Sequence, residues 1–534
     1  MGTVYYGGSI LTMESVQDKP EAVYVAKGRI QAVGSKEAVM QQAGKWAKKV
    51  DLQGKCLMPG FIDPHSHFVL NGQMSLMADL SECKNFADVE KAMKAYIEDN
   101  KITESGIAIG RGYDQNFLEE LSHPNKLVLD KVSTTVPIMI LHISGHLACI
   151  NTPMLALAGI TAETPDPKGG RIGRLNGSQE PDGLLEEGAM MTSQAMIGKR
   201  MKVNIMKMLD GMQRAYIENG VTTVQEGAGN EGNMKLLKLA QLLGKLKVDV
   251  VFYPVVGEEG RKMLRKDPDQ VGRYKKHIKL GGYKMILDGS PQGRTAWMSQ
   301  PYLGGEEGYC AYPWLSDEEA EEHCRIAVDE GRQILVHCNG DAASEQFLNA
   351  YEKALAASTN PNKKALRPVM IHCQTVRNDQ LDRMAAMDMI PSIFVGHVYY
   401  WGDIHLRNFG PERGHHISPA KDALNRGLMI NFHQDTPITK PNMLHSVWAA
   451  ANRRSRLGQV IGEDQKIPVY EALKAVTING AYAYFEEDSK GSIRVGKRAD
   501  LVILDKDPLA VDTDAIKDIR VLETIKDGKT IFRR

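Results

Sequence analysis

From about residue 206 onward, short apolar runs alternate with amphipathic segments, and this repeat restricts the possible folds more than any other feature. A strand followed by a helix is typical of parallel sheets, because the helix carries the chain back to the start of the next strand. Ser316-Asp-Glu-Glu319 has the pattern of a capping box and predicts a helix through Val328. With an earlier run near His65, these units predict an α/β fold, a parallel (β/α)8 TIM-like barrel. The later strands are expected at 221–224, 248–256, 277–287, 334–337, 368–372, 389–395 and 428–432.

The two ends of the chain show a different pattern. Short β-like runs flank turn glycines such as Gly7-Gly8 near the start, and Asp527-Gly528 forms a similar turn near the end. We therefore expect residues 1–58 and 485–534 to complete one β-sandwich domain. Between them, the barrel is expected to begin with its first strand within residues 59–71 and to continue over 206–484.

The stretch 72–205 does not follow the strand–helix rhythm and is longer than a βα loop should be. It predicts an inserted subdomain after the first barrel strand. Insertions at this point overhang the carboxyl face of a barrel, where active sites lie, so we expect this subdomain to cover the substrate.

Charge and cysteine content exclude several classes of partner. Lys+Arg and Asp+Glu both number 66, giving a formal net charge of +0, and no charged block stands out. Nucleic acid and membrane surfaces are therefore not expected partners, and no apolar run approaches the roughly 20 residues of a membrane span. The 7 cysteines are scattered without CxxC spacing. With no export signal in the first residues, a reduced, cytoplasmic protein is expected.

An HxH motif, His65-Ser-His67, ends the apolar stretch that begins at Leu57. Side chains alternate faces along a strand, so two imidazoles two residues apart can reach the same cation. Surface and core histidines also fall two apart by chance, so this pair requires partners elsewhere in the chain.

Such partners are present on separate strand-like runs. His337, His372 and Asp435 fall at or just past the carboxyl ends of predicted strands, and Lys284 lies within one. The carboxyl ends of barrel strands meet at one mouth. Each histidine taken alone is better interpreted as a hydrogen-bonded core residue. The convergence of these side chains from several strands instead favours a metal site.

Lys284 and Asp435 each have two interpretations. Burial beside metals disfavours the charged ammonium of Lys284, and the neutral amine can react with carbon dioxide to give a carbamate that bridges two ions. Alternatively, Lys284 forms an ion pair with Asp288 or Glu226. Asp435 is either a metal ligand that also acts as general base, or a turn residue before Thr436-Pro437.

The motifs resemble the amidohydrolase superfamily, specifically its amidohydrolase-3 or YtcJ-like family. The resemblance covers nearly the whole chain, and its motifs occur in the family's order. They are Gly8 to Met13, Pro59 to His67, Gly145 to Asn151, Lys284 to Ser290, His337 to Asp341 and Gly491 to Asp500. The chain departs from the family in having Ile371 before His372, where Glu is frequent, and His433-Gln-Asp435, where Gly-Ser-Asp is frequent.

The resemblance implies a binuclear centre with two divalent metal ions, zinc given the imidazole ligands, held by His65, His67, Lys284, His337, His372 and Asp435. Lys284 would be the carbamylated bridging ligand, and Asp435 the catalytic proton shuttle. His146, Glu226, His433 and Trp401 are candidates for substrate binding, although the aromatic run that ends at Trp401 could equally be loop packing. A homodimer is the oligomer that such barrels often form.

The implied reaction is hydrolysis of a C–N bond in a small molecule, an amide, formamide or cyclic amide, by a metal-bound hydroxide. A deaminase is the nearest alternative, but such enzymes usually carry Glu three residues after the His at the position of His337, and this chain has Gly340. Ester, lactone or carbamate hydrolysis could use the same site. A non-catalytic binding protein fits less well, because all six ligand positions are present.

Overall fold

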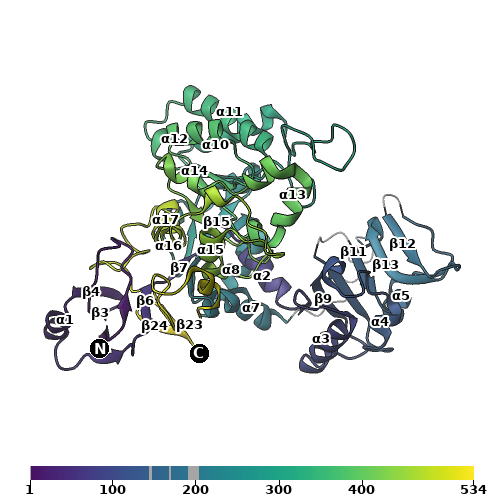
Figure 1. The fold of residues 1–534 in the computed structure, drawn as a ribbon, viewed down its shortest axis with the longest axis horizontal. Coiled ribbons are helices and arrows are strands. Elements are labelled where there is room, and N and C mark those ends of the chain that lie inside the picture. Colours follow the sequence, from purple (N-terminus) through teal and green to yellow (C-terminus); the bar gives the residue numbers. More distant parts are fainter. Residues whose placement is uncertain (1, 144–146, 168–169, 191–203) are drawn as a thin grey trace. The chain divides into compact units, whose positions relative to one another are not determined.

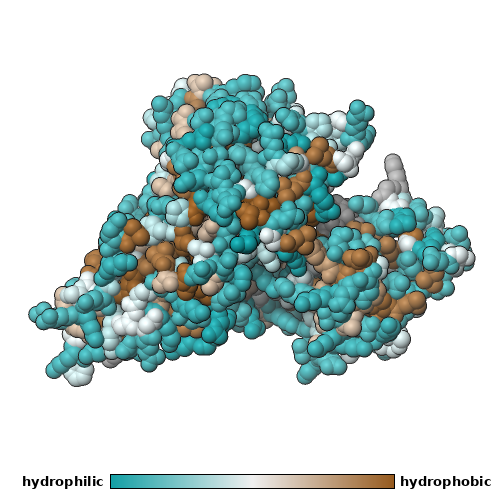
Figure 2. All heavy atoms as spheres, viewed as in Figure 1, coloured by the Kyte–Doolittle hydropathy of each residue, from teal (hydrophilic) through white to brown (hydrophobic). Residues whose placement is uncertain are grey.

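The computed structural model describes residues 2–143, 147–167, 170–190 and 204–534. The chain divides into two compact units, one formed by 1–70 and 213–534 and the other by 71–212 (Figure 1). Within the described ranges, no helix combines the length and apolar character that a bilayer crossing needs. Hydrophilic side chains cover most of the face seen in Figure 2, and the hydrophobic ones form separate groups.

Strands from the two ends of the chain form two sheets in the first unit. One has the order β4-β3-β1-β5, and the other has the order β2-β6-β22-β23-β24, which joins both chain ends in one ladder. The two sheets share a hydrophobic cluster that includes Val23, Leu57 and Ile503. The elements are β1 (Thr3–Tyr6), β2 (Ser9–Ile10), β3 (Ala22–Ala26), β4 (Arg29–Gly34), α1 (Lys36–Ala43), β5 (Lys48–Asp51), β6 (Cys56–Pro59), β22 (Leu501–Leu504), β23 (Val521–Lys526) and β24 (Lys529–Arg533).

The middle of the first unit consists of parallel strands that alternate with helices. They pair in the orders β16-β15-β14-β7 and β17-β18-β19-β20-β21. The strands are β7 (Phe61–Ile62), β14 (Val221–Gly229), β15 (Asp249–Pro254), β16 (Ile278–Leu280), β17 (Tyr283–Ile286), β18 (Ile334–Cys338), β19 (Val369–His372), β20 (Ile390–Ile393) and β21 (Asn431–Phe432).

Helices follow most of these strands. Helix α10 begins with the expected capping box, in which Ser316 and Glu319 each bond the other's backbone N–H. The helices are α2 (Phe68–Met74), α7 (Ile205–Glu218), α8 (Glu231–Leu242), α9 (Glu258–Lys266), α10 (Asp317–Asp329), α11 (Asp341–Ala357), α12 (Asn378–Ala386), α13 (His397–His415), α14 (Ala420–Asn425), α15 (Met443–Asn452), α16 (Val469–Ala475) and α17 (Ile478–Ala483).

The expected strand at 277–287 was wrong as a single element, and this changes the expected sheet. It is divided into β16 and β17, which belong to different sheets, so the described residues form no continuous closed ladder. The division falls at two glycines. A Cβ on Gly282 would lie 2.0 Å from Gln333 O, and one on Gly281 would lie 2.3 Å from the Tyr253 ring. Only residues without a side chain fit this crossing between the sheets.

Two backbone hydrogen bonds connect the two parallel sheets. Val256 N donates to Lys284 O at 2.8 Å, and His67 N donates to Thr436 O at the same distance. The second of these bonds joins the segments that follow β7 and β21. It therefore brings the HxH motif beside the loop that carries Asp435.

The second unit contains a six-stranded sheet of order β12-β13-β11-β10-β9-β8. Alternate residues of its strands enter two hydrophobic clusters: Ile138 packs with α3 and α4, and Met139 packs with α5. The elements are β8 (Ala78–Asp79), α3 (Phe86–Asp99), β9 (Ala108–Tyr113), α4 (Lys126–Asp130), β10 (Ile138–His142), β11 (Leu147–Ile150), α5 (Thr152–Ala158), β12 (Gly170–Arg174) and β13 (Pro181–Glu187).

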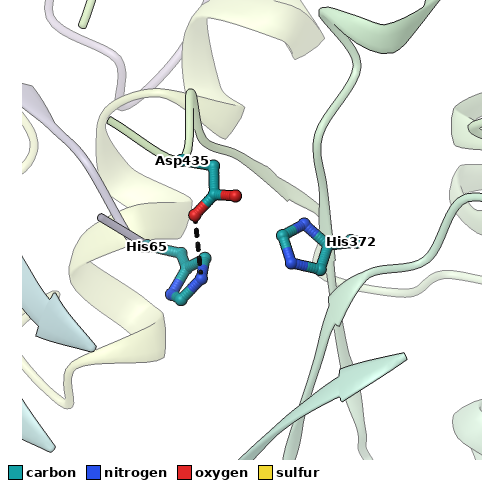
Figure 3. Close-up of side chains that lie close together, drawn as sticks. All are labelled: His65, His372 and Asp435. Carbon is teal, nitrogen blue, oxygen red and sulfur yellow. Dashed lines mark ion pairs between the residues drawn. The ribbon is translucent and has the colours of Figure 1, made fainter. Parts of the chain in front are cut away.

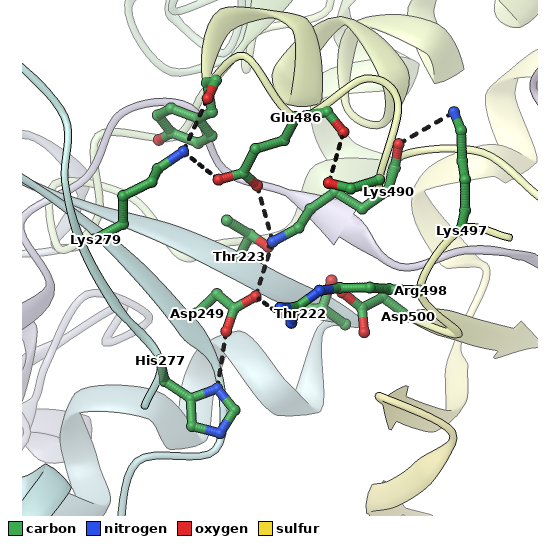
Figure 4. A network of polar contacts seen from close by, with 12 residues as sticks. Thr222, Thr223, Asp249, His277, Lys279, Glu486, Lys490, Lys497, Arg498 and Asp500 are labelled. Carbon is green, nitrogen blue, oxygen red and sulfur yellow. Dashed lines mark hydrogen bonds and ion pairs between the residues drawn. The ribbon is translucent and has the colours of Figure 1, made fainter. Parts of the chain in front are cut away.

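A buried network of charges joins the parallel strands to the C-terminal strands (Figure 4). Asp249, the first residue of β15, contacts Lys490 Nζ at 2.8 Å, Lys526 Nζ at 3.0 Å and His277 Nδ1 at 2.8 Å. Lys526 also contacts Asp500, and Lys490 also contacts Glu486 at 2.8 Å. Burial alone would raise the pKa of Asp249, but the lysines hold it well below its usual value.

Asp249→Asn should lower the free energy of unfolding by about 3–5 kcal/mol, because it leaves Lys490 and Lys526 buried without that carboxylate. Chemical denaturation followed by circular dichroism would measure the change. Arg325→Ala is the matched control, because it removes only exposed pairings with Glu322 and Asp329, and exposed ion pairs contribute little to stability. If Asp249→Asn lowers the free energy of unfolding no more than the control does, the structural role of the network is contradicted.

The same network should make the fold sensitive to acid. The pKa of Asp249 lies well below its unfolded value, so its stabilisation is complete above the unfolded pKa of about 3.9 and is lost as the pH falls below it. Glu486, whose pKa is lowered by Lys490 and Lys279 against the opposing effect of burial, acts in the same direction. Unfolding free energies measured from neutral pH downward should fall less steeply for Asp249→Asn than for the unaltered protein.

Candidate metal-binding active site

Four histidines gather where the parallel strands end, and they share one hydrogen-bonding pattern. In each, Nδ1 contacts a protein group and Nε2 is turned away from that contact. His65 Nδ1 donates to Gln225 Oε1 at 2.7 Å, and His67 Nδ1 donates to Gly227 O at 2.8 Å. His337 Nδ1 donates to Asp288 Oδ1 at 3.1 Å, and His372 Nδ1 lies 3.2 Å from His433 Nε2. Three of these contacts set which nitrogen carries the proton, because their acceptors are oxygens.

Asp435 lies among the Nε2 atoms of this group. Its Oδ1 is 3.3 Å from His65 Nε2 and 3.3 Å from His67 Nε2. Ligand atoms of His65, His372 and Asp435 all lie within 4.8 Å of one another, and Figure 3 shows the three side chains pointing toward a common point. His372 Nε2 is enclosed and has no hydrogen-bond partner within the described part of the chain. This arrangement suits a cation that accepts imidazole and carboxylate ligands.

Lys284 lies in β17 with 1% of its surface exposed. Its Nζ has no hydrogen-bond partner among the described residues. Burial lowers the pKa of Lys284 to about 8, against the opposing effect of Asp435. The alternative ion pair is not formed: Asp288 bonds His337 and the backbone N–H groups of Asn339 and Gly340. Glu226 accepts from Val69 N and from Asn233 Nδ2 instead.

Burial and charge set the protonation of the cluster. Burial, followed by the charge of Lys284, lowers the pKa of His65 to about 3. Burial also holds the pKa of His372 well below its usual value. Burial alone would raise the pKa of Asp435, yet the adjacent His65 and His67 hold it well below its usual value. The neutral imidazoles of His65 and His372 beside an ionised carboxylate are in the protonation states that metal ligands require. At His67 burial acts in the same direction, but contact with Asp435 outweighs it and raises the pKa.

The residues predicted to bind substrate occupy different surroundings. Glu226 is buried, and burial raises its pKa to about 7. His433 is enclosed between Ser392 Oγ, at 3.0 Å, and His372. Trp401 packs against His397 and Phe394, with ring centroids 4.5 and 5.9 Å away. His146 lies outside the described residues. Substrate binding by these four stays a prediction.

Sequence reasoning did not single out the residues that orient the histidines. Gln225 is the acceptor for His65 and also donates to Pro64 O at 2.6 Å. Asp288 was considered only as a partner for Lys284, although it receives His337 and several backbone N–H groups. The available signal was its position just past the end of β17, where polar residues meet in a parallel sheet.

The model of the amidohydrolase family denoted Amidohydro_3 matches residues 48–532. The chain belongs to the amidohydrolase family. Among curated proteins it is similar to the putative amidohydrolase YtcJ of Bacillus subtilis (strain 168), with 28% identity covering 100% of both chains. It is also similar to the N-substituted formamide deformylase of Arthrobacter pascens, with 25% identity over 98% of this chain and 97% of the relative.

Solved structures show the same fold. An uncharacterized metal-dependent hydrolase from Pyrococcus furiosus matches with a TM-score of 0.73 and 24% identity, covering 95% of this chain and 100% of that one. A second, from Pyrococcus horikoshii OT3, matches with a TM-score of 0.74 and 23% identity, covering 96% and 99%. The fold is therefore of the α/β TIM-barrel-like kind.

The residues at the strand ends fit a bound metal ion. The decisive observation is the pair of enclosed atoms without partners, His372 Nε2 and Lys284 Nζ, beside the Asp435 carboxylate. Buried polar atoms are almost always hydrogen-bonded, so two unsatisfied ones in one cluster indicate a ligand that occupies them.

His433→Phe should lower zinc affinity about 10–100-fold, because it removes the partner of His372 Nδ1 while keeping a ring of similar size. Competition with a chromogenic chelator would measure the affinity. His416→Phe, which removes an imidazole bound to Asp422, is the control. Unchanged zinc affinity in His433→Phe would show that His433 does not orient His372.

Proposed function

We propose that the chain hydrolyses a C–N bond in a small molecule: an amide, a formamide or a cyclic amide. One observation carries this proposal. Four imidazoles at the strand ends keep Nε2 turned away from their Nδ1 partners, and a carboxylate and an unpartnered lysine lie beside them. Such an arrangement has no use as packing, since it leaves buried polar atoms unsatisfied.

We assign His65, His67, His337, His372, Lys284 and Asp435 to hold two divalent ions, with zinc as the metal. Lys284 would contribute as a carbamate, which requires its neutral amine, and burial of the ammonium favours that form. For His372 to offer the Nε2 lone pair, its Nδ1–H must donate to His433 Nε2, with His433 Nδ1–H donating in turn to Ser392 Oγ. When bound, the metal supplies Lewis acidity toward water and toward a carbonyl oxygen.

Asp435 is assigned the proton transfer. Its ionised carboxylate takes a proton from the attacking water as the new C–O bond forms at the carbonyl carbon. It returns that proton to the nitrogen when the C–N bond breaks, so the amine leaves neutral. The low pKa of Asp435 keeps it ready to accept the proton at neutral pH.

Similarity to curated proteins favours hydrolysis of a formamide or amide over deamination. The relative named as an N-substituted formamide deformylase matches 98% of this chain. A relative named as a 5-methylthioadenosine/S-adenosylhomocysteine deaminase matches only 17% of it. Cover of the substrate by the inserted unit stays a prediction.

A substrate panel would test the proposal. Zinc-loaded protein should hydrolyse at least one of a set of N-substituted formamides, N-acyl amines and cyclic amides faster than it hydrolyses esters, lactones, carbamates or aminopurines. Release of amine, detected by fluorogenic labelling, would measure the rate. Exclusive deamination, or exclusive ester cleavage, would overturn the proposed bond.

Asp435→Asn should abolish turnover of the substrate that the panel identifies, because the amide cannot take the proton. Its metal content, measured by mass spectrometry, should change little, because the amide oxygen and the other ligands remain. Gln225→Glu is a useful comparison, since it keeps an acceptor for His65 Nδ1. Full activity in Asp435→Asn would rule out the proton transfer.

A further inference from the structure

His397 is the first residue of α13 and lies at the same strand ends as the candidate ligands. The connection runs through Phe394, whose backbone N donates to His372 O at 3.3 Å. The Phe394 ring centroid is 5.4 Å from that of His433 and 4.7 Å from that of His397. After burial, the charges of His405, Asp435 and His337 act on the pKa of His397.

His397 is joined to a second imidazole, deeper in the protein. His397 Nδ1 lies 3.0 Å from His405 Nε2, the ring planes differ by 7°, and the centroids are 5.3 Å apart. Rings that are nearly parallel at this separation, with nitrogens at hydrogen-bond distance, form a bond in the ring plane rather than a face-to-face stack. The pair is buried, with exposures of 4% for His397 and 0% for His405.

The surroundings of His405 determine the direction of this bond. His405 Nδ1 is enclosed, and no residue that the structure describes forms a hydrogen bond with it. Burial lowers the pKa of His405 to about 3, so the ring is neutral and carries one proton. A proton on Nδ1 would leave a buried N–H without an acceptor, whereas a proton on Nε2 leaves only a buried lone pair on Nδ1 without a donor. The unsatisfied N–H is the less tolerated of these two arrangements. The proton therefore belongs on His405 Nε2, which donates to His397 Nδ1.

This bond fixes the other nitrogen of His397. Because Nδ1 accepts from His405, the neutral ring of His397 carries its own proton on Nε2. His397 Nε2 makes no hydrogen bond with any described residue, and it is not among the enclosed unpartnered atoms. An Nδ1–H donor leaves Nε2 with a lone pair in His65, His67 and His337, whereas His397 offers an Nε2–H donor.

We propose that His397 is a further catalytic residue, whose Nε2–H donates to the carbonyl oxygen of the substrate, and that His405 is the positioning residue that fixes this tautomer. The role rests on the proposed C–N hydrolysis. When the water oxygen bonds to the carbonyl carbon, the carbon–oxygen π pair moves to the carbonyl oxygen, and His397 stabilises that negative charge without giving up its proton. When the C–N bond breaks, the electron pair on the carbonyl oxygen forms the carbon–oxygen π bond again, and the nitrogen takes the proton from Asp435.

The tautomers can be measured without any substrate. Two-bond ¹⁵N–¹H correlation spectra of metal-free protein with ¹⁵N-labelled histidine would be assigned by the signals lost in His397→Leu and His405→Phe. Both rings are expected to carry their proton on Nε2. A His397 ring protonated on Nδ1 would overturn the proposal.

Kinetics then test the role in the reaction. His397→Leu should lower kcat by about 10²–10³-fold, the usual effect of losing one donor to a developing oxyanion, with little change in KM or zinc content. His397→Gln places a carboxamide N–H near the position of Nε2 and should recover much of kcat. His405→Phe should lower kcat less than His397→Leu, and His405→Gln should restore it, since a carboxamide can donate to His397 Nδ1.

Phe409→Leu is the matched control, because it alters the ring stacked on His405 at 5.8 Å and leaves the His397–His405 hydrogen bond in place. Its kcat should stay near that of the unaltered protein. If the protein hydrolyses a panel substrate and His397→Leu retains full kcat, the role of His397 is overturned and the proposed function stands. If the unaltered protein hydrolyses nothing on the panel, the proposed function is overturned, and the role of His397 with it.

Discussion

The orientation of the imidazoles is the constraint on which the candidate site depends. A histidine can bind a cation through Nε2 only when that nitrogen is unprotonated, and a hydrogen bond from Nδ1 ensures this. His65, His67 and His337 each direct Nδ1–H to an oxygen: a carboxamide, a backbone carbonyl and a carboxylate. The strands bring the rings together, but these acceptors decide what the rings can do.

The same principle gives two opposite results at one end of the strands. An acceptor at Nδ1 leaves Nε2 with a lone pair, as at His65. A donor at Nδ1 leaves Nε2 with a proton, as we infer for His397. A neutral imidazole therefore serves as a metal ligand or as a hydrogen-bond donor, depending on one buried neighbour. Burial keeps the rings of both His65 and His397 neutral, because it lowers their pKa values.

The parallel strands hold this site only if their other ends are secured. Asp249 lies at the start of β15, and its contacts with Lys490 and Lys526 bind the strand to the C-terminal part of the chain. Arg498 and Asp500 of the Gly491 to Asp500 motif belong to the same network (Figure 4). That motif, which carried part of the family resemblance, therefore has a structural role away from the candidate ligands.

Residue types, spacing and apolar periodicity were sufficient to predict alternating strands and helices, the N-cap of α10 at Ser316, and a set of candidate ligands at strand ends. These features are local, or follow from the shared direction of parallel strands. Only the tertiary structure decided that the chain changes sheets at Gly281-Gly282, that Asp288 orients His337, and that His397 pairs with His405. Each of these depends on side chains meeting across elements, and neither the partner of an imidazole nor the location of its proton follows from the order of residues along the chain.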